Sequence, residues 1–141
     1  VRVAAIYGSG RGRLGASRDT LVNEALEAVG LTRQRAGLAG GLTLSGQKRL
    51  EIARALATGA DLVMLDEVMA GLNPTEIGEM LETLAELRRS RGITFVIVEH
   101  VIGALMTLSD RILVLHHGER IAFGTPEEIG RNKHVEEVYF G

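Results

Sequence analysis

The feature that most constrains the fold is a short apolar run that ends in two adjacent carboxylates, the sequence LVMLDE at residues 62–67. A run of this length, followed at once by the loop sequence AGLNP at 70–74, predicts a buried strand of a parallel sheet. In α/β proteins, ligands bind beyond the carboxyl ends of such strands. Asp66 and Glu67 are therefore the first candidates for chemistry.

Helical and strand patterns alternate from residue 42 onward. They predict helices at 45–58, 74–89, 101–108 and 134–139, and strands at 62–66, 93–98, 111–116 and 119–123. Asn73-Pro74 and Thr125-Pro126 mark helix starts, each with a glutamate in the first turn. This alternation implies an α/β fold with a mainly parallel sheet and flanking helices, and His117-Gly118 predicts a terminal β-hairpin.

The first 41 residues follow a different pattern. Residues 8–17 are rich in glycine and arginine, which predicts a mobile loop, and a short apolar stretch at 3–7 before it reads as a strand. One amphipathic helix is expected at 21–29, with Gly30 as its left-handed C-terminal cap. A second polar stretch with several glycines leads to residue 41.

Composition excludes several classes of protein. The formal net charge of the 141 residues is −2, so no strong field favours nucleic acid or an anionic membrane. Cysteine is absent, which excludes disulfides and thiolate metal sites. Apolar runs are far shorter than the ~18 residues of a membrane-spanning helix, and no signal peptide is visible. We therefore expect a cytoplasmic protein.

Polar residues follow two neighbouring apolar strands. Asp66 is suited to a hydrated Mg²⁺ and Glu67 to orienting a water, although a lone acid after a strand is as often a plain cap. His100 ends the strand FVIVEH and should reach the same sheet edge, where it could donate to a terminal phosphate. A lone histidine is more often a surface or core residue. The Ser- and Gly-containing start of the helix near Ser45 could bind phosphate, or Ser45 could be an ordinary N-cap.

Together these segments resemble the ATP-binding subunit of ABC transporters. The resemblance rests on the order of LTLSGQKRLEIARAL at 42–56, LVMLDE, the AGLNP loop and the strand with His100, and it covers about residues 19–141. RLEIARAL, AGLNP and the ending FGTPEEI…HVEEVYFG look most like subunits of branched-chain amino acid importers. On this resemblance the chain is the carboxyl-terminal part of a P-loop NTPase fold. Residues 1–41 would be a loop plus the remnant of a helical subdomain, and 42–141 the signature helix with the carboxyl-terminal part of the core.

The resemblance also implies site roles. Asp66 would lie near Mg²⁺, with Glu67 as the catalytic carboxylate and His100 as the switch histidine. ATP would further be bound by residues of the signature motif and of the loop that follows the acidic strand, namely Thr43, Ser45, Gly46, Gln47, Gly71 and Asn73. The implied partners are a second ATPase subunit, as a homo- or hetero-dimer, and membrane permease subunits, with no nucleic acid. The protein would then sit in the cytoplasm at the inner face of the cell membrane.

The sequence departs from the family pattern in three places. The motif G-x-x-x-x-G-K-[ST] does not occur; the stretch GRGRLGAS at 10–17 has Ala16 in place of the lysine and lies too near the signature. In the signature, Thr43 replaces the usual serine and Ser45 a usual glycine, which places a Cβ where backbone must approach phosphate. Val68 stands where proline usually follows the acidic pair. We therefore expect the chain alone to be inactive as an ATPase.

Two other functions fit parts of the sequence. One is a catalytically inactive dimerisation or regulatory module with an ABC ATPase-like fold, which the missing phosphate loop favours and the retained Asp66, Glu67 and His100 oppose. The other is the carboxyl-terminal half of a DNA-repair or chromosome-organising ATPase. Sustained heptads and a basic stripe, which that class would carry, are absent from the sequence.

Overall fold

The computed structural model describes residues 1–8 and 17–139, and it divides into two compact units, 1–98 and 99–141. The Gly/Arg-rich segment, including the P-loop-like stretch, lies outside the described residues except for its two ends, Gly8 and Ser17. The domain boundary expected at residue 41 stays a prediction. The division after Val98 is an additional feature of the structure.

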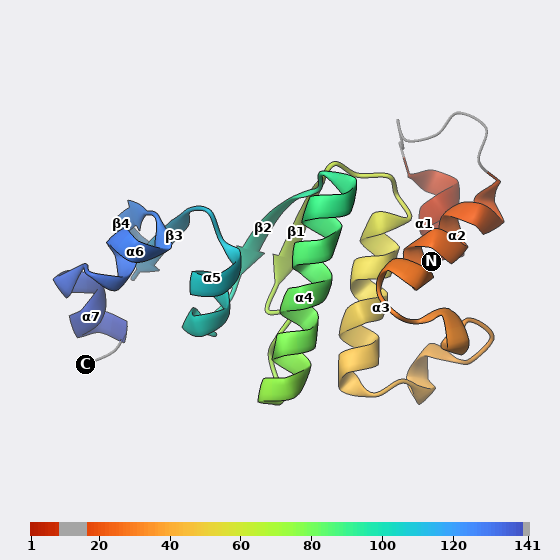
Figure 1. Cartoon of the computed structure of the whole chain (residues 1–141), viewed down its shortest axis with the longest axis horizontal. Coiled ribbons are helices and arrows are strands. Elements are labelled where there is room, and N and C mark those ends of the chain that lie inside the picture. The colour runs from red at the N-terminus through yellow and green to blue at the C-terminus, as the bar shows by residue number, and fades with distance from the viewer. Residues whose placement is uncertain (9–16, 140–141) are drawn as a thin grey trace. The chain divides into compact units, whose positions relative to one another are not determined.

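The first unit holds helices packed beside a parallel strand pair (Figure 1). Its elements are α1 (Arg2–Tyr7), α2 (Arg18–Ala28), the short 3₁₀ turns η1 (Thr32–Gln34) and η2 (Ala39–Gly41), α3 (Leu44–Leu56), β1 (Leu62–Asp66), α4 (Pro74–Arg91) and β2 (Thr94–Val98). The strand expected at 3–7 is wrong, because these residues form α1. A continuous apolar run this short fits either a helix or a strand, and this segment pairs with no strand among the described residues.

Helix ends in this unit follow the local sequence signals. Asn73 begins α4 with a capping box, in which its Oδ1 accepts from the Glu76 amide and its own amide donates to the Glu76 carboxylate, both at 3.0 Å. After α2, Gly30 adopts φ +74°, and the Leu31 amide donates back to the Leu26 carbonyl at 2.8 Å. This backbone angle and this hydrogen bond form the expected left-handed C-terminal cap, since glycine enters this conformation without a Cβ clash.

The core of the first unit lies where α2, α3 and α4 meet the buried face of the strands. The largest side chains with almost no exposure are Val29, Ile52, Met69, Met80, Leu84 and Leu87. Arg49 of α3 joins three elements: its guanidinium donates to Val29 O (3.3 Å), Thr83 Oγ1 (3.1 Å) and Glu79 Oε2 (3.0 Å). Because α2, α3 and α4 share this one side chain, Arg49 helps to fix the angle between the helices.

Strands β1 and β2 are parallel and in register from Leu62–Thr94 to Asp66–Val98. Only one face of the pair is buried: Val63 and Leu65 point into the core, whereas Leu62 and Met64 are 54% and 73% exposed. The strands predicted as buried at 62–66 and 93–98 are therefore covered on one face only. The apolar residues are continuous, as in a central parallel strand, yet the residues of the second face are exposed.

The second unit is a hairpin with short helices: α5 (Ile102–Leu108), β3 (Ile112–His116), β4 (Glu119–Gly124), α6 (Pro126–Gly130) and α7 (Lys133–Tyr139). The antiparallel β3–β4 pair confirms the predicted terminal hairpin. Its turn residues His117 and Gly118 have φ +48° and +82°, as a two-residue hairpin turn requires. Its buried core consists of Ile112, Val114, Ala122, Ile129 and Val135.

The fold is thus α/β, with a parallel pair, flanking helices and a terminal hairpin, as the sequence predicts. Within the described residues no helix has both the length and the hydrophobicity to cross a membrane.

Candidate functional site

The two carboxylates after the apolar run lie at the carboxyl end of β1. Asp66 is the last residue of the strand and is exposed. Glu67 continues the pairing by one bond, since its amide donates to the Val98 carbonyl at 2.9 Å. It then turns sharply into the left-handed region, with φ +47°. The neighbouring strand end and this turn therefore fix the direction in which the chain leaves the sheet.

The start of α3 is capped by Thr43. Its Oγ1 accepts from the Gly46 amide at 3.2 Å, so the interpretation of Ser45 as N-cap is wrong. Ser45 is instead in the first turn and only 7% exposed. The amides of Leu44 and Ser45 remain at the helix end without an intrahelical acceptor, as the geometry of any α-helix requires. This turn can offer N–H groups and the positive end of the helix dipole to an anion.

Gly46 and Gln47 complete this helix start. Gly46 is buried, and a Cβ there would lie 3.2 Å from the Leu42 Cβ, so the close packing favours glycine. The Gln47 side chain donates from Nε2 to the Leu42 carbonyl at 3.1 Å, although it is exposed. The structure thus brings Thr43, Gly46 and Gln47 together in one capped turn.

The AGLNP loop packs back onto this helix start. Gly71 has φ +78°, and a Cβ built on it would lie 2.9 Å from Leu44 Cδ2. The side chain of Leu44 therefore rests against the backbone of this loop. Asn73 uses its Oδ1 in the α4 capping box, which gives it a structural role whatever else it contacts. The helix start and the loop, expected to bind ATP, are neighbours within the same unit.

His100 lies in the second unit, in a bend two residues after Val98, and is exposed. Chain connectivity places it directly after the strand end that pairs with Asp66. Its expected meeting with Asp66 and Glu67 at one edge stays a prediction.

Sequence reasoning missed Lys48. Its Nζ donates to the backbone carbonyl of Glu67 at 2.9 Å, from a position 19 residues earlier in the chain. A lysine between Gln47 and Arg49 in an amphipathic helix reads as an ordinary surface cation. No pattern in the sequence signals a bond between a side chain and a distant carbonyl.

The donors at this edge fit a magnesium ion that a nucleotide brings with it. Among the described residues, no group of three or more His, Cys, Asp or Glu could hold a metal ion. Mg²⁺ in phosphoryl-transfer sites is bound through one or two carboxylates together with phosphates and waters. The exposed carboxylate of Asp66 at a strand end is suited to that task, so the donor set agrees with a nucleotide-dependent metal.

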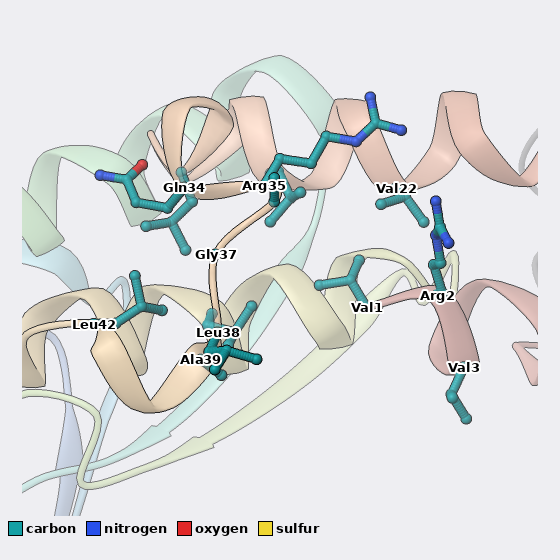
Figure 2. A pocket seen from close by; sticks show the side chains of 14 residues that line it. Val1, Arg2, Val3, Val22, Gln34, Arg35, Gly37, Leu38, Ala39 and Leu42 are labelled. Carbon is teal, nitrogen blue, oxygen red and sulfur yellow. The ribbon is translucent and has the colours of Figure 1, made fainter.

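A cavity of about 570 Å³ lies elsewhere in the first unit, between α1, α2 and the 34–42 segment. Figure 2 shows the aliphatic side chains of Val22, Leu38 and Leu42 among those that line it, together with the side chains of Arg2 and Arg35. None of the predicted site residues lines this cavity. The candidate chemistry therefore belongs to the β1 edge and not to the cavity.

Sequence comparison finds similar proteins of one kind, ATP-binding proteins of transport systems. No protein-family model matches the chain. The high-affinity branched-chain amino acid transport ATP-binding protein LivG of Salmonella typhimurium is 44% identical over 116 residues, which is 82% of this chain and 46% of that protein. BraF of Pseudomonas aeruginosa, with the same description, is 41% identical over 116 residues, again 82% and 46%. The chain spans about half the length of the curated relatives it matches.

Solved structures agree with the sequence comparison. MJ1267, an ATP-binding cassette of an ABC transporter, superposes with a TM-score of 0.80 at 27% identity, covering 93% of this chain and 53% of that one. CbiO1 from Clostridium perfringens, part of the transporter complex cbiONQ, gives a TM-score of 0.79 at 26% identity, covering 96% and 54%. In both the sequence and the structure comparisons, this chain matches about half of the other protein's length.

Proposed function

We propose that this chain, which corresponds by sequence and fold to the carboxyl-terminal part of an ATP-binding subunit of ABC transporters, supplies the hydrolytic half of an ATP site in an importer for branched-chain amino acids. The phosphate-binding loop of that site comes from a segment outside the present sequence, since the motif G-x-x-x-x-G-K-[ST] does not occur in it.

The chemistry follows from the end of β1. Asp66 would hold the magnesium ion of bound ATP, which neutralises charge on the phosphates. Glu67 would accept a hydrogen bond from the attacking water and orient it toward the γ-phosphate. His100 would donate to that phosphate. Positioning and electrostatic stabilisation are the contributions that phosphoryl transfer requires of a protein.

The start of α3 would act on a second nucleotide. Thr43, Ser45, Gly46 and Gln47, with Gly71 and Asn73 of the neighbouring loop, would face the ATP bound by a second ATPase subunit. That subunit, as a homo- or hetero-dimer, and membrane permease subunits would be the partners. The protein would be cytoplasmic and peripheral at the inner face of the membrane.

The observation that carries the proposal is the geometry after β1. Asp66 is paired with Val98 at the carboxyl end of a parallel pair, and the Glu67 amide is bonded to that same residue. Two adjacent acids are thereby fixed at the sheet edge where α/β proteins bind their ligands.

A chimera tests the proposal. The chain is joined to the amino-terminal half of the LivG relative, and phosphate release from ATP with Mg²⁺ is measured; we expect at least weak turnover. Glu67→Gln should then lower the rate by ~10²–10⁴-fold, the range for loss of a general base. Ser45→Gly should raise it, because removal of the Cβ lets the helix start approach phosphate.

Controls separate the alternatives. The chain alone should match a no-enzyme blank, and turnover by it that Glu67→Gln abolishes would contradict the proposal. A folded chimera that binds ATP but shows no turnover would favour the inactive dimerisation or regulatory module. If Ser45→Gly leaves the rate unchanged or lowers it, the alignment of 43–47 with the signature motif is wrong.

A further inference from the structure

Lys48 is a side chain of α3 that the structure bonds to the segment carrying the two carboxylates. Its ammonium donates to the Glu67 carbonyl at 2.9 Å; the residue is partly buried in the helix, although the bond itself is exposed. We infer that Lys48 is a positioning residue: it holds the backbone of Glu67 in the conformation from which the carboxylate leaves the sheet.

The conformation at Glu67 needs such support. A glutamate at φ +47° is unfavourable, because its Cβ approaches the following carbonyl, and such a residue persists only where its surroundings hold it. Three bonds do so. The Glu67 amide donates to Val98 O at 2.9 Å, and the Glu67 carbonyl accepts from the Ala70 amide at 3.2 Å and from Lys48. Of these partners, only the ammonium of Lys48 is charged and comes from a side chain.

A second contact ties the same two segments together. The side chain of Leu44, in the first turn of α3, rests against the backbone of Gly71, where an added Cβ would lie 2.9 Å from Leu44 Cδ2. The first two turns of α3 therefore contact the loop at two points. Lys48 contacts it at Glu67, and Leu44 contacts it four residues later in the loop, at Gly71. We call these two contacts the α3 clasp.

The functional consequence rests on the function proposed above. Glu67 would orient the water at this chain's own nucleotide, whereas the start of α3 would face the nucleotide of a second subunit. Because the α3 clasp joins the two, a shift of the helix start on meeting one nucleotide would move the carboxylate that serves the other. Lys48 would link the two sites by a contact within one chain.

The test needs no nucleotide. Isotopically labelled chain is compared by NMR with Lys48→Met, Lys48→Arg and the control Arg54→Met, an exposed position further along α3. In Lys48→Met we expect the carbonyl carbon resonance of Glu67 to shift and hydrogen exchange at the Ala70 amide to accelerate about tenfold, as loss of a charge-assisted hydrogen bond would give. Lys48→Arg keeps a donor and should retain the original values, as should Arg54→Met.

Two results would overturn the inference. One is an unchanged Glu67 carbonyl resonance and Ala70 exchange rate in folded Lys48→Met. The other is accelerated exchange that is uniform over α3 and α4, which would indicate general destabilisation. If Lys48→Met does not fold, Leu44→Ala tests the other contact. The amide of Leu72, which donates to the Met69 carbonyl at 3.2 Å, should then exchange faster than in the parent chain, and unchanged exchange there would count against the α3 clasp.

The chimera supplies a separate measurement. There Lys48→Met should lower kcat about tenfold and leave the KM for ATP unchanged, because the bond orients Glu67 and touches no nucleotide. An inactive chimera would count against the proposed function, while the NMR result on the chain would still decide the role of Lys48.

Discussion

Gly71 meets two requirements at once: its backbone adopts a left-handed conformation, and its lack of a side chain leaves room for close packing. Its φ of +78° lies in the region that residues with a Cβ rarely adopt, and the side chain of Leu44 occupies the space that a Cβ would need. A glycine at this position thus lets the loop turn after β1 and lets the start of α3 approach it. Both requirements are local, and both belong to the folded state.

We predict that Gly71→Ala destabilises the chain by about 1–2 kcal/mol, the usual cost of a left-handed conformation with a Cβ. The free energy of unfolding is measured in urea. Gly78→Ala is the matched control: Gly78 is inside α4 with nothing within 4 Å of an added Cβ, so the same change should stabilise by about 0.5–1 kcal/mol. Equal effects of both substitutions would contradict the role assigned to the Gly71 backbone.

At the scale of elements, the β1–β2 pair is a sheet with one buried face and one exposed face. Val63 and Leu65 are buried on one face, whereas the opposite face exposes Met64 at 73% and Val98 at 59%. A parallel sheet is normally covered on both faces, and a strand edge or apolar face left open tends to pair with another chain. The exposure of these apolar residues makes this face a candidate surface for association with a second chain.

We predict that the chain self-associates through this face. Sedimentation velocity over a range of concentrations should show species larger than a monomer. Met64→Lys should shift them toward monomer, because it places a charge in the apolar face. Thr94→Lys adds the same charge at an exposed position of β2 that is already polar, so it should have a smaller effect. A parent chain that stays monomeric at all concentrations would rule out this interpretation.

At the scale of the molecule, the two units differ in how much apolar surface they bury. The second unit's core is a small hydrophobic cluster that includes Ile112 and Ile129, beside a two-stranded hairpin. The first unit buries side chains from α2, α3, α4 and β1. Small cores and isolated hairpins are marginally stable, so stability should be uneven along the chain.

We predict that hydrogen exchange under native conditions is faster for the amides of β3 and β4 than for those of α3 and α4. Ile129→Ala should accelerate exchange in the hairpin further, since it removes a side chain that is 4% exposed in that small core. Mass spectrometry of exchanged peptides measures both. Equal protection in the two units would show that the size of these cores does not set local stability.

The sequence by itself determined the features that depend on neighbours along the chain. The β1 strand with its terminal acids, the Asn73 and Thr125 capping boxes, the Gly30 cap and the His117-Gly118 turn all follow from residues within a few positions of one another. Propensity, capping and turn geometry act over that range, so a single sequence is enough to predict them.

Only the tertiary structure decided the features that depend on residues far apart. The bond from Lys48 to Glu67, the left-handed backbone at Glu67 and the contact of Leu44 with Gly71 arise where α3 meets the loop after β1. The apolar run of β1 predicted a buried strand, yet Leu62 and Met64 on one face are exposed, because burial is set by what packs against a strand and not by the strand's own residues. A local pattern specifies which element forms; the contacts between elements, which fix the direction of a side chain or the covering of a face, are decided when the chain packs.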